Sequence, residues 1–228
     1  ARDDRWTLHT GVHYPWQMRQ ELAEKIFRVP EHKFRVVTGD IGGSFGLRGA
    51  TYHEQILGMW ASRRLGRPVK WVCERTEGFM SDHHGRDVVW DGELALDKNG
   101  KILAMRAMSY ANVGAYLAGK GTLPPVINLG TAAGTYKVDA MHIDVTGVFT
   151  NTNPISPFRG NGRAEASYLT ERLIDIAADE MGLDPAELRR INAIQPEDMP
   201  YKTALTFTYD CGEFENNLNN ALEISDYK

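Results

Sequence analysis

A glycine-dense turn at residues 42–46 follows a short apolar stretch and is the feature that most constrains the fold. Phe34, Val36 and Val37 predict a buried strand before the turn, and a helical pattern begins soon after it. Glycine adopts positive φ angles without strain and lets the backbone approach a ligand closely. Successive amide groups in such a turn can hold an anion or the polar edge of a cofactor. On its own, the motif fits equally well a strand-to-helix turn that binds nothing.

The composition bounds the class of protein. The 228 residues are 42% hydrophobic and 25% charged, which is enough for the core of one large or two small globular domains. The formal net charge is −4 and the basic residues form no block, so nucleic acid is not an expected partner. No apolar run reaches the about 18–20 residues that cross a bilayer, and the first residues lack a signal peptide's apolar core. We expect a soluble cytoplasmic protein, and the direct start at Ala1 on a strand-like pattern suggests a fragment.

The cysteines and the adjacent histidines predict no metal centre. Cys73 and Cys211 lie far apart and form no CxxC motif, which argues against a zinc ribbon or a disulfide framework. We expect Cys73 to be buried and Cys211 to lie near the surface. His83 and His84 point to opposite faces of an extended segment, so they cannot chelate one metal ion by themselves.

Hydrophobic periodicity predicts strands and helices without a strict βαβ alternation, which favours an α+β fold. Within the second helix, Met59 and Trp60 are expected in the core. The Asn-Gly pair at residues 99–100 predicts a hairpin. The long glycine-rich segment 117–135 is expected to be irregular and to act as a functional loop. The predicted helices cover residues 16–27, 52–65, 164–181, 184–194 and 214–224. The predicted strands cover residues 6–10, 33–41, 67–77, 88–96, 101–116 and 141–149, with weak alternation at 201–209.

A second glycine turn at residues 158–163 carries an arginine and precedes another long helix. The guanidinium of Arg159 can offer a planar set of donors to a phosphate, a carboxylate or a pterin edge. The alternative role for Arg159 is an ion pair with a nearby carboxylate. The usual motifs of nucleotide hydrolysis, dinucleotide binding, serine hydrolysis and zinc proteolysis are missing from the sequence. Together the two turns predict a site for a cofactor of another kind.

The order of several motifs resembles the large subunits of the molybdenum hydroxylases, the group of xanthine dehydrogenase, aldehyde oxidase and aerobic carbon monoxide dehydrogenase. The resemblance covers essentially the whole chain, and the carbon monoxide dehydrogenase-like branch is the most similar. The motifs that carry it are Asp-Ile-Gly-Gly-Ser-Phe-Gly at 40–46, Gly-Arg-Pro-Val-Lys-Trp-Val at 66–72, Phe-Arg-Gly-Asn-Gly-Arg-Ala-Glu-Ala at 158–166, and the segments 188–192 and 194–197.

The resemblance implies that residues 1–228 are a fragment of a molybdopterin-binding domain, which could divide into two subdomains with interleaved strands and helices. It implies an α+β fold of the aldehyde oxidase and xanthine dehydrogenase type. In that family the first turn presents backbone amides to the molybdenum centre, and the second loop lies over the same centre. The residues that the resemblance assigns to the cofactor are Gly43, Ser44, Phe45, Gly46, Arg159, Gly160, Asn161, Gly162 and His13. His13 aligns with a position where relatives commonly carry a glutamine, and Tyr14 is the next candidate for that position.

The implied activity is hydroxylation of an aldehyde or an N-heterocycle with oxygen derived from water. The implied cofactor is molybdopterin in its cytosine dinucleotide form, and electrons would leave through iron–sulfur clusters and FAD on partner subunits or domains. The remainder of the large subunit is a further implied partner. No residue of this chain is assigned as catalytic, because the family's general-base glutamate lies downstream, and the isolated chain is expected to be inactive.

Departures from the family pattern narrow the expected substrate. Gly160 stands where carbon monoxide dehydrogenases carry a cysteine that holds copper, so oxidation of carbon monoxide is not expected. Gly49 stands where purine hydroxylases carry a glutamate, so a purine substrate is not expected either. Since His13 also departs from the pattern, the alternative function is a noncatalytic binding or assembly module that retains the fold. A third reading is an unrelated α+β domain that binds another anion.

Overall fold

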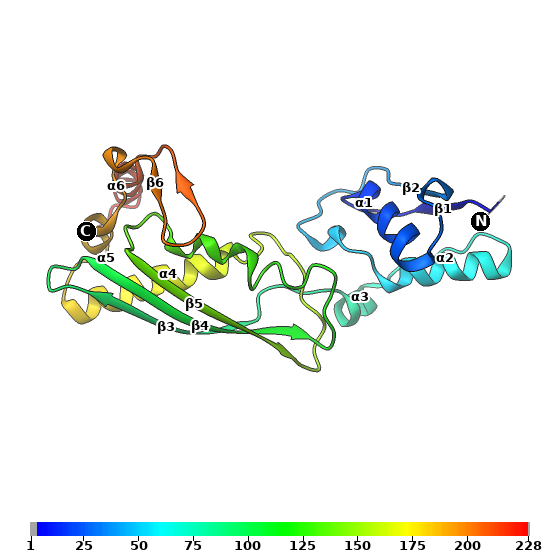
Figure 1. Ribbon diagram of the computed structural model, residues 1–228, viewed down its shortest axis with the longest axis horizontal. Helices are drawn as coiled ribbons and strands as arrows, with labels where there is room; N and C mark the ends of the chain where they lie inside the picture. The colour runs from blue at the N-terminus through cyan, green and yellow to red at the C-terminus, as the bar shows by residue number, and fades with distance from the viewer. Residues whose placement is uncertain (1–3, 228) are drawn as a thin grey trace. The chain divides into compact units, whose positions relative to one another are not determined.

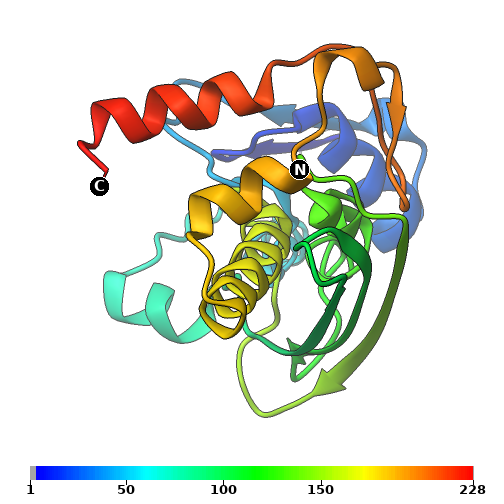
Figure 2. The ribbon, with the colours of Figure 1, turned by 90° about the vertical axis from the view of Figure 1, so that its left-hand side faces the viewer.

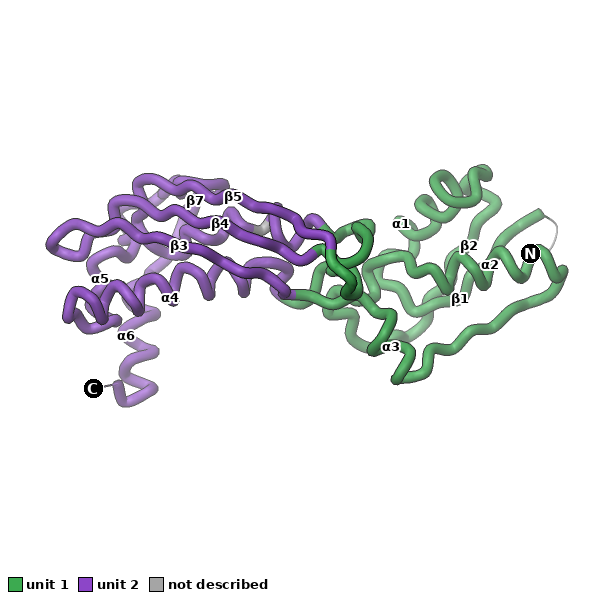
Figure 3. Tube along the Cα trace, turned by 90° about the horizontal axis from the view of Figure 1, so that it is seen from below, with its two compact units in different colours: residues 1–85, 113–121, 150–159 green, residues 86–112, 122–149, 160–228 purple. Residues whose placement is uncertain are grey.

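This computed structural model describes residues 4–227, with the backbone alone for Asn128. The chain divides into two compact units, each built from three separate stretches of sequence (Figure 3). Unit 1 comprises Ala1–Gly85, Val113–Gly121 and Thr150–Arg159. Unit 2 comprises Arg86–Asn112, Thr122–Phe149 and Gly160–Lys228.

Unit 1 is built around two parallel strands. β1 (Trp6–His9) pairs with β2 (Phe34–Val37), and Trp6 lies opposite Phe34 with their rings stacked at 5.3 Å. The connection between them is helical, as predicted: α1 (Pro15–Gln20) continues as the π-helix η1 (Glu21–Phe27), and the 3-10 helix η2 (Glu31–Lys33) precedes β2 (Figure 1). The apolar stripe of this helix turns inward because its residues recur at helical spacing. The buried residues of this small core are Trp6, Val12, Met18, Leu22, Ala23, Phe34 and Met59.

The rest of unit 1 departs from the predicted pattern in one place. After β2 come the short 3-10 helix η3 (Leu47–Gly49) and the helix α2 (His53–Leu65), both close to expectation. The predicted strand at 67–77 is wrong, because α3 (Arg75–Ser81) begins within its last three residues and residues 67–74 are assigned neither strand nor helix. An extended segment becomes a strand only where a neighbouring backbone pairs with it. Within the described chain, β1 and β2 pair only with each other.

Two predictions about burial in unit 1 are also wrong, those for Trp60 and Cys73. Met59 is buried, as expected, but the neighbouring Trp60 is 55% exposed. Cys73 is exposed and not buried, since the segment that carries it has no sheet to pack against; Cys211 is exposed, as expected.

Unit 2 contains a three-stranded sheet in the order β3 (Val88–Leu96), β4 (Ile102–Gly114), β5 (Ala140–Phe149). β3 and β4 form the predicted antiparallel hairpin. The carboxylate of Asp97 accepts hydrogen bonds from the amides of Asn99 and Lys101, both at 2.9 Å, and Gly100 adopts a φ of +86°. The turn therefore forms from local hydrogen bonds that the sequence signals directly.

The long helix α4 (Arg163–Met181) packs on this sheet, as Figure 2 shows in a view along the helix. Its buried residues recur every three or four positions, which confirms the predicted helix. The segment 117–135 is not irregular throughout, because Ile127–Ala133 forms the 3-10 helix η4 against α4. Leu129, Ala132 and Ala133 are buried there, so this stretch belongs to the core of unit 2.

The C-terminal part of unit 2 follows the predicted order. α5 (Pro185–Asn192) is capped by the carboxylate of Asp184, which accepts hydrogen bonds from Ala186 N at 2.6 Å and Glu187 N at 3.1 Å. The 3-10 helix η5 (Pro196–Asp198), the short pair β6 (Tyr201–Lys202) and β7 (Thr208–Tyr209), and α6 (Phe214–Ile224) complete the chain. The fold is α+β, as predicted.

A buried asparagine joins the hairpin to α5, and its removal should destabilise unit 2. The Asn192 side chain accepts a hydrogen bond from Ile102 N at 2.8 Å and donates to Gly100 O at 2.8 Å and Leu188 O at 2.9 Å. Asn192→Ala leaves buried backbone groups without partners and should lower the free energy of unfolding by about 2–4 kcal/mol. Urea unfolding measures this. Asn220→Ala, at an exposed position of α6, should have little effect, and equal losses in both variants would contradict the assignment.

Candidate functional site

The glycine turn presents a run of backbone amides with no internal partners. Gly42, Phe45 and Gly46 adopt positive φ angles of +67°, +52° and +108°. Among residues 4–227, the amide groups of 42–46 donate no hydrogen bond to another residue. Turns of this kind form a positively polarised concavity that favours anions and polar cofactor edges.

A second loop of unit 1 lies directly against the turn. The amide of Arg159 donates a hydrogen bond to Phe45 O at 2.8 Å. A Cβ on Gly46 would lie 1.9 Å from Pro157 O, so only glycine permits this approach. The Arg159 guanidinium lies 6.0 Å from the centre of the Phe45 ring, and within the described chain it forms no ion pair. The structure therefore brings the first predicted turn and the start of the second together.

The segment 82–85 supports the second loop from the other side. His84 N donates to Pro154 O at 3.2 Å, and Ser156 N donates to His84 O at 3.0 Å. The His84 imidazole makes a further hydrogen bond with Asn153 O at 2.7 Å. These bonds give His84 a structural role, and no group of three metal-ligating side chains occurs among the described residues.

Tyr52 ties this segment to the end of the glycine turn. Its hydroxyl donates to the Asp82 carboxylate at 2.5 Å, and its oxygen lies 3.1 Å from Leu47 O. Burial, followed by the nearby Asp82 carboxylate, raises the pKa of Tyr52, so the hydroxyl stays protonated and remains a donor. The Tyr52 ring stacks on His83 at 4.7 Å, and burial lowers the pKa of His83.

His13 lies beside the residues that follow the turn. Its amide donates to Arg48 O at 2.8 Å, while its exposed imidazole stacks on Tyr14 at 4.1 Å. Lys120 lies 4.6 Å from the centre of the Tyr14 ring. The backbone of His13 is thus fixed near the turn, and its side chain is free to reach a ligand.

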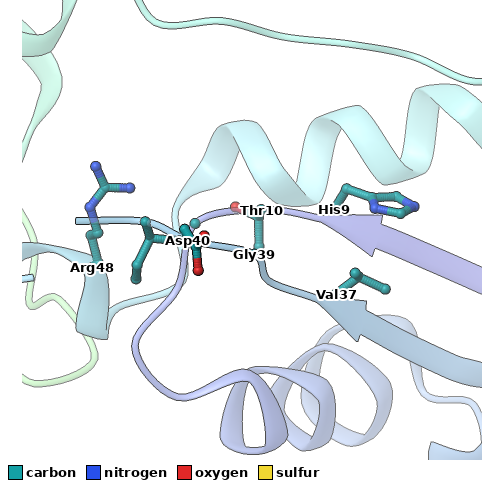
Figure 4. Close-up of a pocket in the computed structure, with 8 residues that line it drawn as sticks. His9, Thr10, Val37, Gly39, Asp40 and Arg48 are labelled. Atoms are coloured by element: carbon teal, nitrogen blue, oxygen red, sulfur yellow. The ribbon is translucent and has the colours of Figure 1, made fainter. Parts of the chain in front are cut away.

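An open pocket of about 560 Å³ lies beyond the carboxyl ends of β1 and β2 (Figure 4). Asp40 and Arg48 lie toward one end of it, and His9 and Val37 lie on the strands at the other. Within residues 4–227, neither Asp40 nor Arg48 forms an ion pair. The sequence argument missed Arg48 as a candidate, although an arginine two residues after a glycine turn is a usable signal.

The remaining predicted residues belong to unit 2. Gly160, Asn161 and Gly162 all adopt positive φ angles of +93°, +49° and +92°, and Gly162 caps the N-terminus of α4. A Cβ on Gly162 would lie 2.1 Å from Pro124 O, so this glycine is required by close backbone contact. The boundary between the units therefore falls inside the second predicted turn, after Arg159.

The donor set fits a polyanionic or pterin-like cofactor. The amides of 42–46 and the guanidinium of Arg159 have no acceptor among residues 4–227. The Ser44 hydroxyl is buried and has no hydrogen-bond partner in the described ranges. Leaving it unpaired costs free energy, which a hydrogen bond to a bound polar group would recover.

No helix of the described chain is long and apolar enough to cross a membrane.

Comparison with known proteins gives a consistent match. The sequence profile of the molybdopterin cofactor-binding domain matches residues 1–193. The chain is 36% identical over 213 residues to the 6-hydroxypseudooxynicotine dehydrogenase complex subunit gamma of Paenarthrobacter nicotinovorans, covering 91% of this chain and 27% of that protein. It is 39% identical over 202 residues to the carbon monoxide dehydrogenase large chain of Hydrogenophaga pseudoflava, covering 87% and 25% respectively.

A solved structure agrees. The crystal structure of quinoline 2-oxidoreductase from Pseudomonas putida 86 superposes with a TM-score of 0.91 at 32% identity, covering 97% of this chain and 28% of that one. The chain thus spans about a quarter of the length of the curated relatives it matches.

Adding one methyl group at Gly46 should separate the two loops. In Gly46→Ala the new Cβ meets Pro157 O, and the φ of +108° becomes strained. We expect a loss of about 2–3 kcal/mol in the free energy of unfolding, measured in urea. Gly58→Ala on α2, where a Cβ would meet nothing within 4 Å, should instead stabilise the chain by about 0.5–1 kcal/mol. A neutral Gly46→Ala variant would contradict the close contact.

The buried environment of His83 should make stability depend on pH. Its folded pKa lies below the ordinary value of 6.5, because burial, with His53 and His84, outweighs the opposing charges of Asp82 and Glu54. The unfolded state binds the proton first, so the free energy of unfolding should fall as pH drops below 6.5 and level off below the folded pKa.

Urea unfolding between pH 7.5 and 5 measures this dependence. His83→Gln should flatten the curve in that window. His32→Gln, which changes an exposed histidine of η2, should keep the wild-type curve. If His83→Gln retains the full dependence, another group is responsible.

Proposed function

This chain belongs to the molybdopterin cofactor-binding domain family, and we propose that it forms one part of the cofactor site of a larger molybdenum hydroxylase. The proposed reaction is hydroxylation of an aldehyde or an N-heterocycle with oxygen derived from water. The observation that carries the proposal is the run of unpartnered amides at 42–46, held against the loop that presents Arg159.

Each group has a defined task in this proposal. When bound, the molybdenum cofactor supplies the redox chemistry and activates water-derived oxygen. The amides of 42–46 donate hydrogen bonds to the cofactor and stabilise negative charge that develops there. The Arg159 guanidinium binds an anionic or pterin edge, and the Ser44 hydroxyl donates to the same group. His13 donates from the position where the family commonly has a glutamine.

The wider assembly is part of the proposal. The remainder of the large subunit would supply the general base, and electrons would pass to iron–sulfur clusters and FAD on partner subunits or domains. The proposed form of the cofactor is the cytosine dinucleotide. A relative described as quinoline 2-oxidoreductase supports an N-heterocyclic substrate. Gly160, where carbon monoxide dehydrogenases carry the copper-holding cysteine, argues against carbon monoxide.

Cofactor content of the complete enzyme tests the proposal. Arg159→Gln should lower molybdenum and pterin per subunit several-fold, measured by mass spectrometry of the metal and fluorescence of the oxidised pterin. Arg172→Gln, an exposed arginine on α4, should retain the wild-type content. Turnover of quinoline and of a simple aldehyde, with a redox dye as acceptor, tests the substrate class. A folded complete subunit that contains neither molybdenum nor pterin would favour the noncatalytic module.

A further inference from the structure

The segment 67–73 has the pattern of a strand, but no strand of the described chain pairs with it. Val69, Trp71 and Cys73 alternate with Lys70 and Val72, as in a strand with two different faces. Trp71 and Val72 are 46% and 67% exposed. Among the described residues, the amides of 69–73 donate no hydrogen bond. Figure 3 shows the chain that joins α2 to α3 running along the edge of unit 1.

The sheet of unit 1 lacks the strands that such a sheet normally has. β1 and β2 are parallel and form a two-stranded sheet. Parallel sheets are usually larger and buried on both faces. The order strand β2, helix α2, extended segment is that of a crossover, and the second strand of a crossover joins the same sheet. α2 contacts β1, so the segment that follows α2 begins beside this sheet.

The helix before the segment also exposes large apolar side chains. On α2, Leu57, Trp60 and Leu65 are 59%, 55% and 57% exposed. Val69 and Trp71, in the segment itself, are 41% and 46% exposed. Where exposed apolar side chains adjoin one another they usually mark an interface.

We propose that 67–73 is a strand of a larger sheet, whose missing neighbour is an extended segment of the same large subunit from outside this chain. The inference rests on the proposed function, in which this chain is part of that subunit. The matched relatives are about four times longer than the matched region, so the polypeptide needed is present in them. The partner strand should carry apolar residues at alternate positions, which would cover Val69 and Trp71.

A second copy of this chain is a poorer occupant. An antiparallel pair of two copies centred on this segment would place Lys70 opposite Lys70, and like charges in cross-strand pairs are destabilising. A lysine on an exposed edge is also a common means of preventing self-association.

Hydrogen–deuterium exchange and thiol labelling can test the pairing. Exchange of the amides of 69–73 is compared between the isolated 228-residue chain and the complete large subunit, both prepared without molybdenum cofactor. We expect exchange in the complete subunit to slow by about 100-fold or more, because a paired strand opens only with its foldon. Maleimide labelling of Cys73, located by peptide mass spectrometry, should slow in parallel, with the urea-unfolded subunit as the fully reactive reference.

A pair of variants separates pairing from general damage. Trp71→Asp should reduce the yield of folded complete subunit several-fold, whereas Lys70→Asp, on the opposite face, should not. In the isolated chain both positions are exposed, so both variants should keep the wild-type thermal midpoint.

Several results would overturn the proposal: fast exchange of 69–73 in the complete subunit, protection in the isolated chain through self-association, or wild-type yield of the Trp71→Asp subunit. None of these measurements involves the metal. If the amides of 69–73 exchange slowly in a complete subunit that binds no molybdenum, the proposed function is contradicted but the strand pairing is not.

Discussion

The candidate site depends on the absence of a side chain at Gly46. Because the turn can approach within contact of Pro157 O, Phe45 O accepts the amide of Arg159 at 2.8 Å. The Phe45 carbonyl thus joins the two loops, while the amides of 42–46 donate to no acceptor among residues 4–227. One backbone contact therefore determines both the shape of the site and the sign of its partial charge.

Several polar groups around this contact form no hydrogen bond within the described residues. Gly42, Gly43 and Phe45 are exposed, and an amide that water can reach loses little free energy by having no protein acceptor. The buried Ser44 hydroxyl has no such compensation in the described chain. The Tyr52 hydroxyl, kept protonated by burial and by Asp82, supports the end of the turn. A site with rigid loops and unused donors is preorganised for a ligand that brings acceptors.

The sequence could predict what local chemistry determines. The hairpin follows from Asn99 and Gly100, and the cap of α5 follows from Asp184, because in each case the deciding hydrogen bonds lie within a few residues. The two glycine turns were identified for the same reason. The predicted strand at 67–77 is not formed in the described chain and Trp60 is exposed, since strand pairing and burial both depend on a distant partner. Periodicity shows that a face is apolar but not what covers it. The spacing of Arg48 after the first turn was a signal that the sequence argument missed, whereas its position beside His13 arises only from folding.

The interleaving of the two units has a consequence for biosynthesis. Unit 1 needs residues 150–159, and the chain visits unit 2 twice before reaching them. During synthesis residues 4–85 therefore leave the ribosome well before residues 150–159, which belong to the same unit. The contact between the glycine turn and Arg159 can form only after residue 159 has been synthesised. Such long-range closure slows folding and lengthens the exposure of apolar surface, which is when a chaperone can act on the chain.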